Sequence, residues 1–256
     1  MSGRLDATVA LVTGASSGIG EATALALAAE GATVALVARR GDRLDAVADR
    51  IGSAGGGGRA LAVVADVTDE GQARQAVERA AGELGRIDVL VNNAGMMLLG
   101  PVEGAPLDEW QRMVAVNLLG LLYCSHAALP HLLAAAAGDP RGVADLVNVS
   151  SVAGRVARSG SGVYNATKHA VGAFSEALRQ EVTGRHVRVS LVEPGAVATE
   201  LAGHNRPEIL DGIHQRFGGV EQLQAADVAE AITWIVTRPR RVAVNEVLVR
   251  PTEQEG

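Results

Sequence analysis

The sequence predicts an α/β protein with a doubly wound parallel sheet and helices on both faces. Short runs rich in β-branched residues alternate along the chain with longer Ala- and Leu-rich stretches at helical spacing. The short runs are apolar throughout, so we expect both faces of each strand to be covered. This alternation is typical of parallel strands joined by crossover helices.

Seven strands are predicted, in the order in which the apolar runs occur. They cover residues 8–13, 33–38, 60–65, 87–92, 144–150, 187–193 and 244–249. All seven fit one open sheet, and a chain of 256 residues leaves no room for a second domain of similar size. Residues 1–256 are therefore predicted to form a single domain.

Helices are predicted between the strands, over residues 18–30, 69–84, 108–136 and 163–183. The most apolar stretch, 114–137, is long enough to cross a membrane. Asn117, His126, Pro130 and His131 interrupt it, which favours a buried or interface helix.

Two segments are predicted to be irregular. The glycine cluster at 52–58 indicates an exposed loop after a helix. Residues 200–223 show no clear strand pattern and follow the sixth strand. Ligands of open α/β sheets bind beyond the carboxyl ends of the strands, so this segment is the candidate substrate lid.

Composition excludes several classes of protein. Hydrophobic residues make up 48% and charged residues 20% of the chain, which is typical of a globular protein. The net charge of −6 argues against a nucleic-acid partner. A single cysteine, Cys124, excludes an internal disulfide and is compatible with a reducing cytoplasm. Residues 1–6 lack the pattern of a signal peptide, so a cytoplasmic location is expected.

A glycine-rich turn follows the first predicted strand. It reads T-G-A-S-S-G-I-G over residues 13–20 and leads into a helix. Glycines allow close backbone approach, and the helix amino terminus offers free N–H groups to an anion. In the first strand–helix unit, this favours a dinucleotide site over an ordinary glycine turn. The predicted contacts are Gly14, Ser16, Ser17, Gly18, Ile19 and Gly20.

The end of the second strand selects the cofactor. An NAD site places an acid there, against the ribose 2′-hydroxyl. This chain has Arg39 and Arg40 instead, and guanidiniums suit a 2′-phosphate. We therefore expect NADP(H) rather than NAD(H), although two solvated arginines at a helix start would give the same pattern.

Tyr164 and Lys168 form the predicted chemical centre. They lie four residues apart on one helix face, and Lys168 is the only lysine among 23 basic residues. A phenol has a pKa of about 10, and a nearby ammonium together with a positive nicotinamide would lower that pKa.

Ser151 ends the fifth predicted strand, thirteen residues before Tyr164. Its hydroxyl is suited to bonding a substrate carbonyl oxygen. A helix or turn cap is the alternative interpretation.

These motifs, with others of matching order and spacing, resemble the short-chain dehydrogenases/reductases in their compact single-domain branch. The matching pieces are residues 13–20, 66–67, 92–95, 117, 150–151, 164–168 and 194–199. The resemblance implies a seven-stranded Rossmann sheet. It also implies Tyr164 as acid/base, Lys168 as ribose ligand and pKa modifier, Ser151 as carbonyl anchor, and Asn117 as support for a water relay.

The resemblance also implies most of the cofactor contacts. Asp66 would meet the adenine, a turn at 93–95 would flank the cofactor, and residues 197 and 199 would touch the nicotinamide amide. The contacts implied are Asp66, Val67, Asn93, Ala94, Gly95, Tyr164, Lys168, Pro194, Gly195, Val197 and Thr199. Arg39 stands where NADP-dependent members carry a basic residue, whereas Ser16 and Ser17 depart from members with an additional basic residue there. No metal ligands are assigned.

A finer resemblance points to the subgroup of clavulanic acid dehydrogenase and bacterial 3-hydroxy acid dehydrogenases. It rests on residues 97–103, 117–120, 128–133, 178–181 and 249–252. Residues 138–142 depart from it as an apparent insertion. This subgroup reduces aldehydes or oxidises β-hydroxy acids with NADP(H).

The sequence therefore predicts an NADP(H)-dependent oxidoreductase acting on a small aldehyde or ketone, or in reverse on a secondary alcohol or β-hydroxy acid. A catalytically silent NADP-binding or regulatory protein is the alternative. A sugar-nucleotide epimerase or dehydratase would need a longer carboxyl-terminal region and a different glycine turn. The 108–136 helix is apolar all round and cannot bury every side against one sheet face, which predicts an oligomer. The family resemblance implies that this helix and the 163–183 helix pack between subunits, and we expect a homotetramer, or a dimer.

Overall fold

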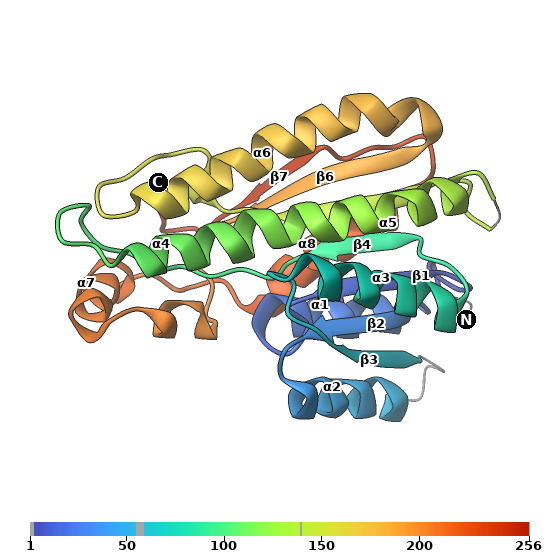
Figure 1. Ribbon diagram of the computed structural model, residues 1–256, viewed down its shortest axis with the longest axis horizontal. Coiled ribbons are helices and arrows are strands. Elements are labelled where there is room, and N and C mark those ends of the chain that lie inside the picture. Colours follow the sequence, from blue (N-terminus) through green and yellow to red (C-terminus); the bar gives the residue numbers. More distant parts are fainter. Residues whose placement is uncertain (1–2, 55–58, 139, 256) are drawn as a thin grey trace.

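The computed structural model describes residues 3–54, 59–138 and 140–255, and its centre is a seven-stranded parallel sheet (Figure 1). The strands are β1 (Val9–Thr13), β2 (Thr33–Ala38), β3 (Ala60–Val64), β4 (Val89–Asn92), β5 (Ala144–Val149), β6 (Val187–Pro194) and β7 (Glu246–Val249). The predicted fold class is confirmed, and the strand ends differ from prediction by at most two residues. Residues 55–58 of the predicted glycine loop and residue 139 of the predicted insertion lie outside the described residues.

The strand order β3-β2-β1-β4-β5-β6-β7 makes β1 the neighbour of both β2 and β4. The chain therefore winds outward to β3, returns across the sheet, and winds the other way to β7. Leu11 pairs with Ala35 on one side and with Leu90 on the other. Beyond the carboxyl ends of β1 and β4 the crossover connections diverge, and a crevice forms there.

Helices cover both faces because successive strand residues point to opposite sides. On β1, Leu11 belongs to one buried cluster, whereas Ala10 and Val12 belong to the other. One layer contains α3 (Glu70–Leu84), α4 (Leu107–Val114), α5 (Leu121–Ala136) and α6 (Gly162–Val182), and the other contains α1 (Gly18–Ala29), α2 (Gly41–Ser53) and α8 (Ala225–Val236).

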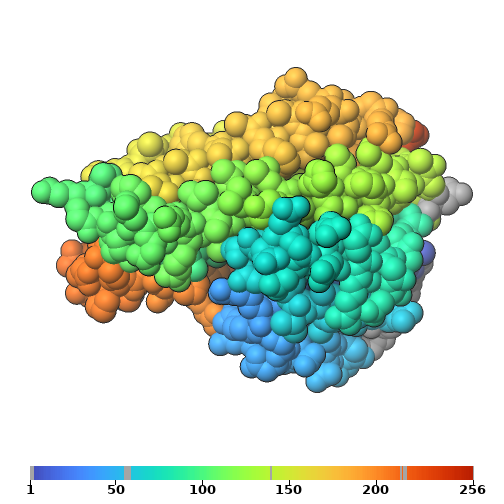
Figure 2. All heavy atoms as spheres, viewed as in Figure 1, coloured from blue at the N-terminus to red at the C-terminus, as the bar shows by residue number. Residues whose placement is uncertain are grey.

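The predicted 108–136 helix is one continuous helical run with a change of pitch. A π-helical segment, η1 (Ala115–Gly120), joins α4 to α5. The run from Leu107 to Ala136 is long enough and apolar enough to cross a membrane, and 44% of its apolar 18-residue stretch is buried inside the protein. It packs against α3 and α6, and Figure 2 shows its atoms as a continuous green band between those two helices.

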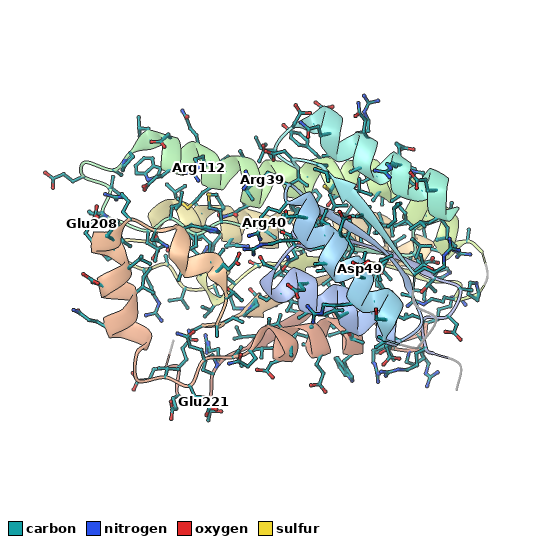
Figure 3. The ribbon with its side chains drawn as sticks, turned by 90° about the horizontal axis from the view of Figure 1, so that it is seen from below. Arg39, Arg40, Asp49, Arg112, Glu208 and Glu221 are labelled. Atoms are coloured by element: carbon teal, nitrogen blue, oxygen red, sulfur yellow. The ribbon has the colours of Figure 1, made fainter. Side chains whose placement is uncertain are left out.

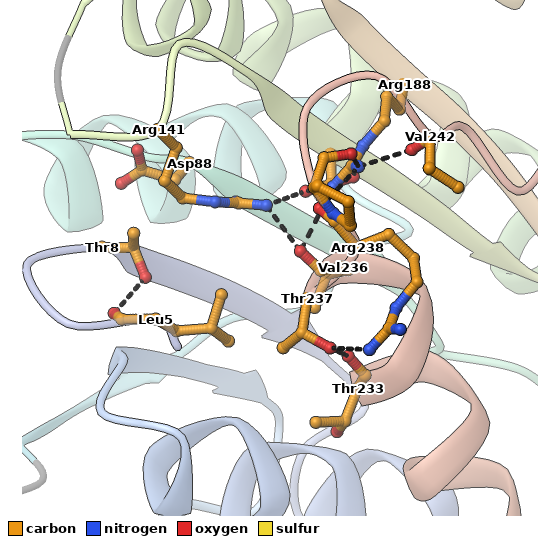
Figure 4. A network of polar contacts seen from close by, with 12 residues as sticks. Leu5, Thr8, Asp88, Arg141, Arg188, Thr233, Val236, Thr237, Arg238 and Val242 are labelled. Atoms are coloured by element: carbon orange, nitrogen blue, oxygen red, sulfur yellow. Dashed lines mark hydrogen bonds and ion pairs between the residues drawn. The ribbon is translucent and has the colours of Figure 1, made fainter. Parts of the chain in front are cut away.

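A buried ionic network ties β5, β6 and α8 together at the amino ends of the strands (Figure 4). Asp145 is fully buried and accepts from Arg188 at 2.7 and 2.9 Å. Arg188 also donates to the carbonyl oxygens of Val242, at 2.7 Å, and Val236, at 3.2 Å. Arg141 adds a 2.8 Å bond to the same carboxylate. The network lies at the end of the sheet opposite the crevice.

Residues 200–223 are more regular than predicted. They contain the 3₁₀ turn η4 (Glu200–His204) and the helix α7 (Pro207–Phe217). Proline fits the first position of a helix, where no N–H bond is lost, so Pro207 was a start signal that the sequence analysis missed. The expected absence of a strand within the segment holds, since Leu223 forms only an isolated bridge with Val197.

Candidate active site

A cavity of about 810 Å³ lies beyond the carboxyl ends of the central strands. It runs from the glycine turn and the arginines after β2 to the first turn of α6. Every site residue predicted from the sequence lines it except Gly20 and Asn117, which lie behind its wall. The structure therefore brings together residues that are up to 185 positions apart, from Gly14 to Thr199.

The glycine turn has a conformation that few other residues adopt. Gly14 and Gly18 have φ values of +66° and +55°. A Cβ on Gly20 would lie 2.3 Å from the carbonyl oxygen of Gly14, so only glycine lets α1 pack this closely on the turn. Ser17 precedes α1 without capping it through its side chain. Within the described part of the chain no side chain accepts from the first amides of α1, and this cradle fits a phosphate group.

Arg39 and Arg40 have different environments (Figure 3). The Arg39 side chain is 68% exposed, and its guanidinium lies 3.9 Å from Asp66. Arg40 donates to the hydroxyls of Ser16, at 3.0 and 3.1 Å, and Ser17, at 2.7 Å. Arg40 is therefore built into the glycine turn, whereas Arg39 keeps most of its donors in solvent.

Glu200, at the start of η4, was not identified from the sequence. Its carboxylate accepts from Arg40 at 3.0 Å and from Arg43 at 2.5 Å. Hydrogen bonds from these two guanidiniums lower the pKa of Glu200 to about 2. The segment after β6 is thus tied to the arginines after β2 by an ionised carboxylate.

The turn after β4 is locked to the glycine turn. Asn93 donates from Nδ2 to the carbonyl of Thr13 at 3.0 Å. The Thr13 hydroxyl accepts from the backbone N–H groups of Asn93 and Ala94, at 3.0 and 3.1 Å. Asp66, after β3, accepts from the N–H and hydroxyl of Thr68 at 3.0 and 2.8 Å. These bonds fix the cavity wall along the predicted nucleotide side.

The segment after β6 is held by the carboxyl-terminal region. Gly195 donates to the carbonyl of Val249 at 2.7 Å, and the N–H of Ala196 donates to Gln254 at 2.8 Å. A Cβ on Gly195 would lie 2.3 Å from Oε1 of Gln254, which explains the glycine. Gln254 also lines the cavity, and no motif near it could have indicated this. Thr199 precedes η4 and caps it, since its hydroxyl accepts from the N–H of Leu201 at 3.4 Å.

Tyr164 and Lys168 lie one turn apart on α6, and each is 6% exposed. The Lys168 ammonium lies 5.9 Å from the centre of the Tyr164 ring and donates to the carbonyl of Val149, at the end of β5, at 2.9 Å. Burial lowers the pKa of Lys168 to about 8. The predicted convergence of both groups on one site is therefore observed.

The chain's own residues raise the pKa of Tyr164, whereas the sequence predicts that Lys168 and a positive nicotinamide together lower it. Burial disfavours the phenolate and is the larger effect, while a hydrogen bond with Ser151 acts in the lowering direction. The chain's own residues therefore keep the phenol protonated.

Ser151 caps the 3₁₀ turn η2 (Val152–Gly154), accepting from the N–H of Ala153 at 3.1 Å. The turn-cap interpretation is thus confirmed. The same hydroxyl lines the cavity and contacts Tyr164, so capping does not remove it from the site.

Asn117 lies in η1 and is 1% exposed. Its amide accepts from the N–H of Met96 at 2.7 Å and donates to the carbonyl of Met96 at 2.8 Å and to the Thr167 hydroxyl at 3.2 Å. Asn117 therefore connects the chain after β4 with α6 from behind the cavity wall.

An open parallel sheet with a phosphate-type glycine turn and a tyrosine–lysine pair at its switch point defines an oxidoreductase of the dinucleotide-binding type. This chain belongs to the short-chain dehydrogenase family, whose family model, described as short chain dehydrogenase, matches residues 8–209.

Two sequence relatives and one solved structure illustrate the similarity. Glycine betaine reductase ATRR of Emericella nidulans is 40% identical over 252 residues, which are 98% of this chain but 19% of that protein. An uncharacterized oxidoreductase of Staphylococcus saprophyticus is 38% identical over 96% of both chains. The closed form of serine dehydrogenase complexed with NADP+ superposes with a TM-score of 0.87 at 31% identity, covering 97% of each chain.

Proposed function

We propose that this protein is an NADP(H)-dependent oxidoreductase that reduces a small aldehyde or ketone, or in reverse oxidises a secondary alcohol or β-hydroxy acid. The observation that carries the proposal is the position of Ser151, Tyr164 and Lys168. They line the same cavity as the glycine turn and the arginines after β2. A group that donates a proton and a site for a dinucleotide are thus adjacent.

The residues present fit the cofactor. The amides at the start of α1 would hold the pyrophosphate, and the largely exposed Arg39 would meet the 2′-phosphate. Arg40, Asp66, the 93–95 turn, Val67 and the 194–199 segment would complete the contacts predicted from the sequence. The NADP+ bound in the serine dehydrogenase structure supports this choice. When bound, NADPH supplies the hydride for the substrate carbon.

The chain's own residues supply the proton and the positioning. The raised pKa of Tyr164 keeps its phenol protonated, ready to donate to the substrate oxygen during reduction. Ser151 would hydrogen-bond the same oxygen. Lys168, fixed by the Val149 carbonyl, would hold the ribose and favour the phenolate after the proton has left. Asn117 would support this arrangement from behind.

Residues 200–223 serve as the substrate lid of a single domain covering 1–256. The partners are small molecules, with no nucleic acid or membrane, and the location is cytoplasmic. The assembly is a homotetramer, or a dimer, formed through the apolar α4–α5 helix and α6. Light scattering at micromolar concentration tests the assembly, and a monomer would contradict it.

A panel of ketones, aldehydes, β-hydroxy acids and a trimethylammonium aldehyde, followed by NADPH absorbance, tests the activity. The last compound is included because one relative is named glycine betaine reductase. Turnover that is lost in Tyr164→Phe supports the proposal. Tight NADPH binding without turnover of any compound would favour the catalytically silent alternative.

A further inference from the structure

The cavity contains a third arginine that the proposed chemistry does not use. Arg39 lies near Asp66, and Arg40 is paired with Glu200. Arg158 also lines the cavity and is half-buried. Within residues 3–54, 59–138 and 140–255, its guanidinium makes no hydrogen bond or ion pair; its polar contacts are those of its backbone, whose N–H donates to Asn165 and whose carbonyl accepts from Ser161. A half-buried cation without a partner is costly unless a ligand supplies one.

The base of Arg158 is fixed with respect to the catalytic tyrosine. Asn165, next to Tyr164 and 4% exposed, accepts from the N–H of Arg158 at 3.2 Å. The same amide donates to the carbonyls of Ala153, at 2.7 Å, and Val156, at 3.0 Å. The segment from η2 to Arg158 is therefore fastened to the first turn of α6. This geometry places Arg158 at the substrate end of the cavity.

The surroundings of Arg158 favour an anion. Apolar residues line the same cavity, among them Met97, Leu99, Val156, Leu201, Ala202 and Ile213. Within the described residues, the acids lining the cavity are Asp66 and Glu200, which are both engaged at the nucleotide end by Thr68 and by Arg40, respectively. An apolar wall strengthens the field of a guanidinium, and no carboxylate at this end balances it.

We propose that Arg158 binds a carboxylate of the substrate, so that the protein acts on short oxo or hydroxy acids. The inference rests on the proposed function, because it concerns the substrate of the same reaction. A planar guanidinium matches a carboxylate with two parallel hydrogen bonds, which orients the substrate as well as binding it. The carbonyl or alcohol carbon then lies between this anchor and the Ser151–Tyr164 pair. A substrate with a quaternary ammonium group would meet charge of the same sign.

The test compares succinic semialdehyde with its methyl ester, which has the same carbonyl but no charge. The wild type is expected to have a higher kcat/KM for the acid. Arg158→Gln should lower kcat/KM for the acid by roughly 10- to 150-fold, which is the range for loss of a hydrogen bond to a charged group. It should change kcat/KM for the ester by less than about threefold. Arg158→Lys should retain part of the preference. Arg74→Gln, which removes an exposed arginine of α3 outside the cavity, should change kcat/KM for neither compound.

The outcomes separate the two proposals. Three results would overturn the role of Arg158 and leave the proposed function intact. The wild type would have equal kcat/KM values for the acid and the ester, or it would prefer a trimethylammonium aldehyde, or Arg158→Gln would lower kcat/KM equally for the acid and the ester. Absence of turnover with every carbonyl compound would overturn the proposed function and this inference together. NADPH binding by fluorescence and thermal unfolding of Arg158→Gln show whether the variant is folded and loaded.

Discussion

Arg40 and Glu200 form an ion pair of 3.0 Å across 160 positions of the chain. The pair joins the residues that follow β2 to the first residue of the proposed lid. Arg43 binds the second oxygen of the same carboxylate, so two cations hold one anion. Charges at the nucleotide end and the position of the lid are therefore linked through Glu200.

The two arginines after β2 should affect cofactor use differently. Arg39→Ser removes the exposed guanidinium and is expected to lower kcat/KM with NADPH by roughly tenfold, with no change for NADH. Arg40→Ser also releases Ser16, Ser17 and Glu200, so it should impair both cofactors. Steady-state kinetics with NADPH and NADH measure this difference. A wild type that prefers NADH would refute the assignment of both residues.

Glu200→Gln should tighten NADPH binding. The ionised carboxylate pairs with Arg40, the neighbour of the Arg39 that would meet the 2′-phosphate, and at this distance it would repel that phosphate. Removing one charge near the exposed cavity mouth is expected to lower Kd for NADPH by roughly two- to fivefold and to leave NADH unchanged. Glu221→Gln, an exposed acid of the same region away from Arg40 (Figure 3), is the control. Weaker NADPH binding in Glu200→Gln would show that tethering the segment outweighs the repulsion.

The Asp145–Arg188 pair should dominate the stability of the sheet's amino end. Asp145→Asn leaves the buried guanidinium of Arg188 without a compensating charge. Removing one partner of a buried pair costs about 3–5 kcal/mol in the free energy of unfolding. Urea titration of Asp145→Asn measures this loss in the free energy of unfolding. The activity per folded molecule should be unchanged, because the network lies at the end of the sheet opposite the cavity. Arg179→Gln breaks an exposed pair with Glu176 and should cause no measurable change.

Local signals predicted the fold and the nucleotide end of the site. Apolar runs mark buried parallel strands, and the 13–20 turn needs glycines for reasons that act within a few residues. The contacts of Glu200 with Arg40 and of Gln254 with Ala196 depend on tertiary placement over many residues, and single acids or amides carry no pattern. The spacing of Tyr164 and Lys168 did not reveal the burial that raises the pKa of Tyr164, because burial follows from tertiary packing.

Lys168 should reduce stability at neutral pH. Its pKa is about 8 in the folded chain, below the usual 10.5, so between these values the unfolded chain binds more protons and stability rises with pH. Below pH 8 the burial of the charged Lys168 ammonium therefore lowers the free energy of unfolding by about 3 kcal/mol. Lys168→Met is expected to raise the free energy of unfolding at pH 7 by roughly 1–2 kcal/mol, since the bond to Val149 is also lost. Urea titrations at pH 7, 8, 9 and 10 should show this gain shrinking as pH rises. A gain independent of pH would contradict the linkage.

Tyr164→Phe and Lys168→Arg should separate proton transfer from cofactor binding. Phenylalanine keeps the buried ring but has no proton to donate, so turnover should fall by at least about a hundredfold while NADPH affinity is retained.

Arginine keeps the charge, yet its wide planar fork does not fit the space between the Val149 carbonyl and the Tyr164 ring, where a compact ammonium lies. Lys168→Arg should therefore impair both affinity and turnover, which accounts for one lysine in a chain whose other 22 basic residues are arginines. Fluorescence titration with NADPH and single-turnover rates on a substrate from the panel measure the two quantities separately. Near wild-type values for Lys168→Arg would make the single lysine an accident of composition, and substantial turnover by Tyr164→Phe would remove the phenol from the mechanism.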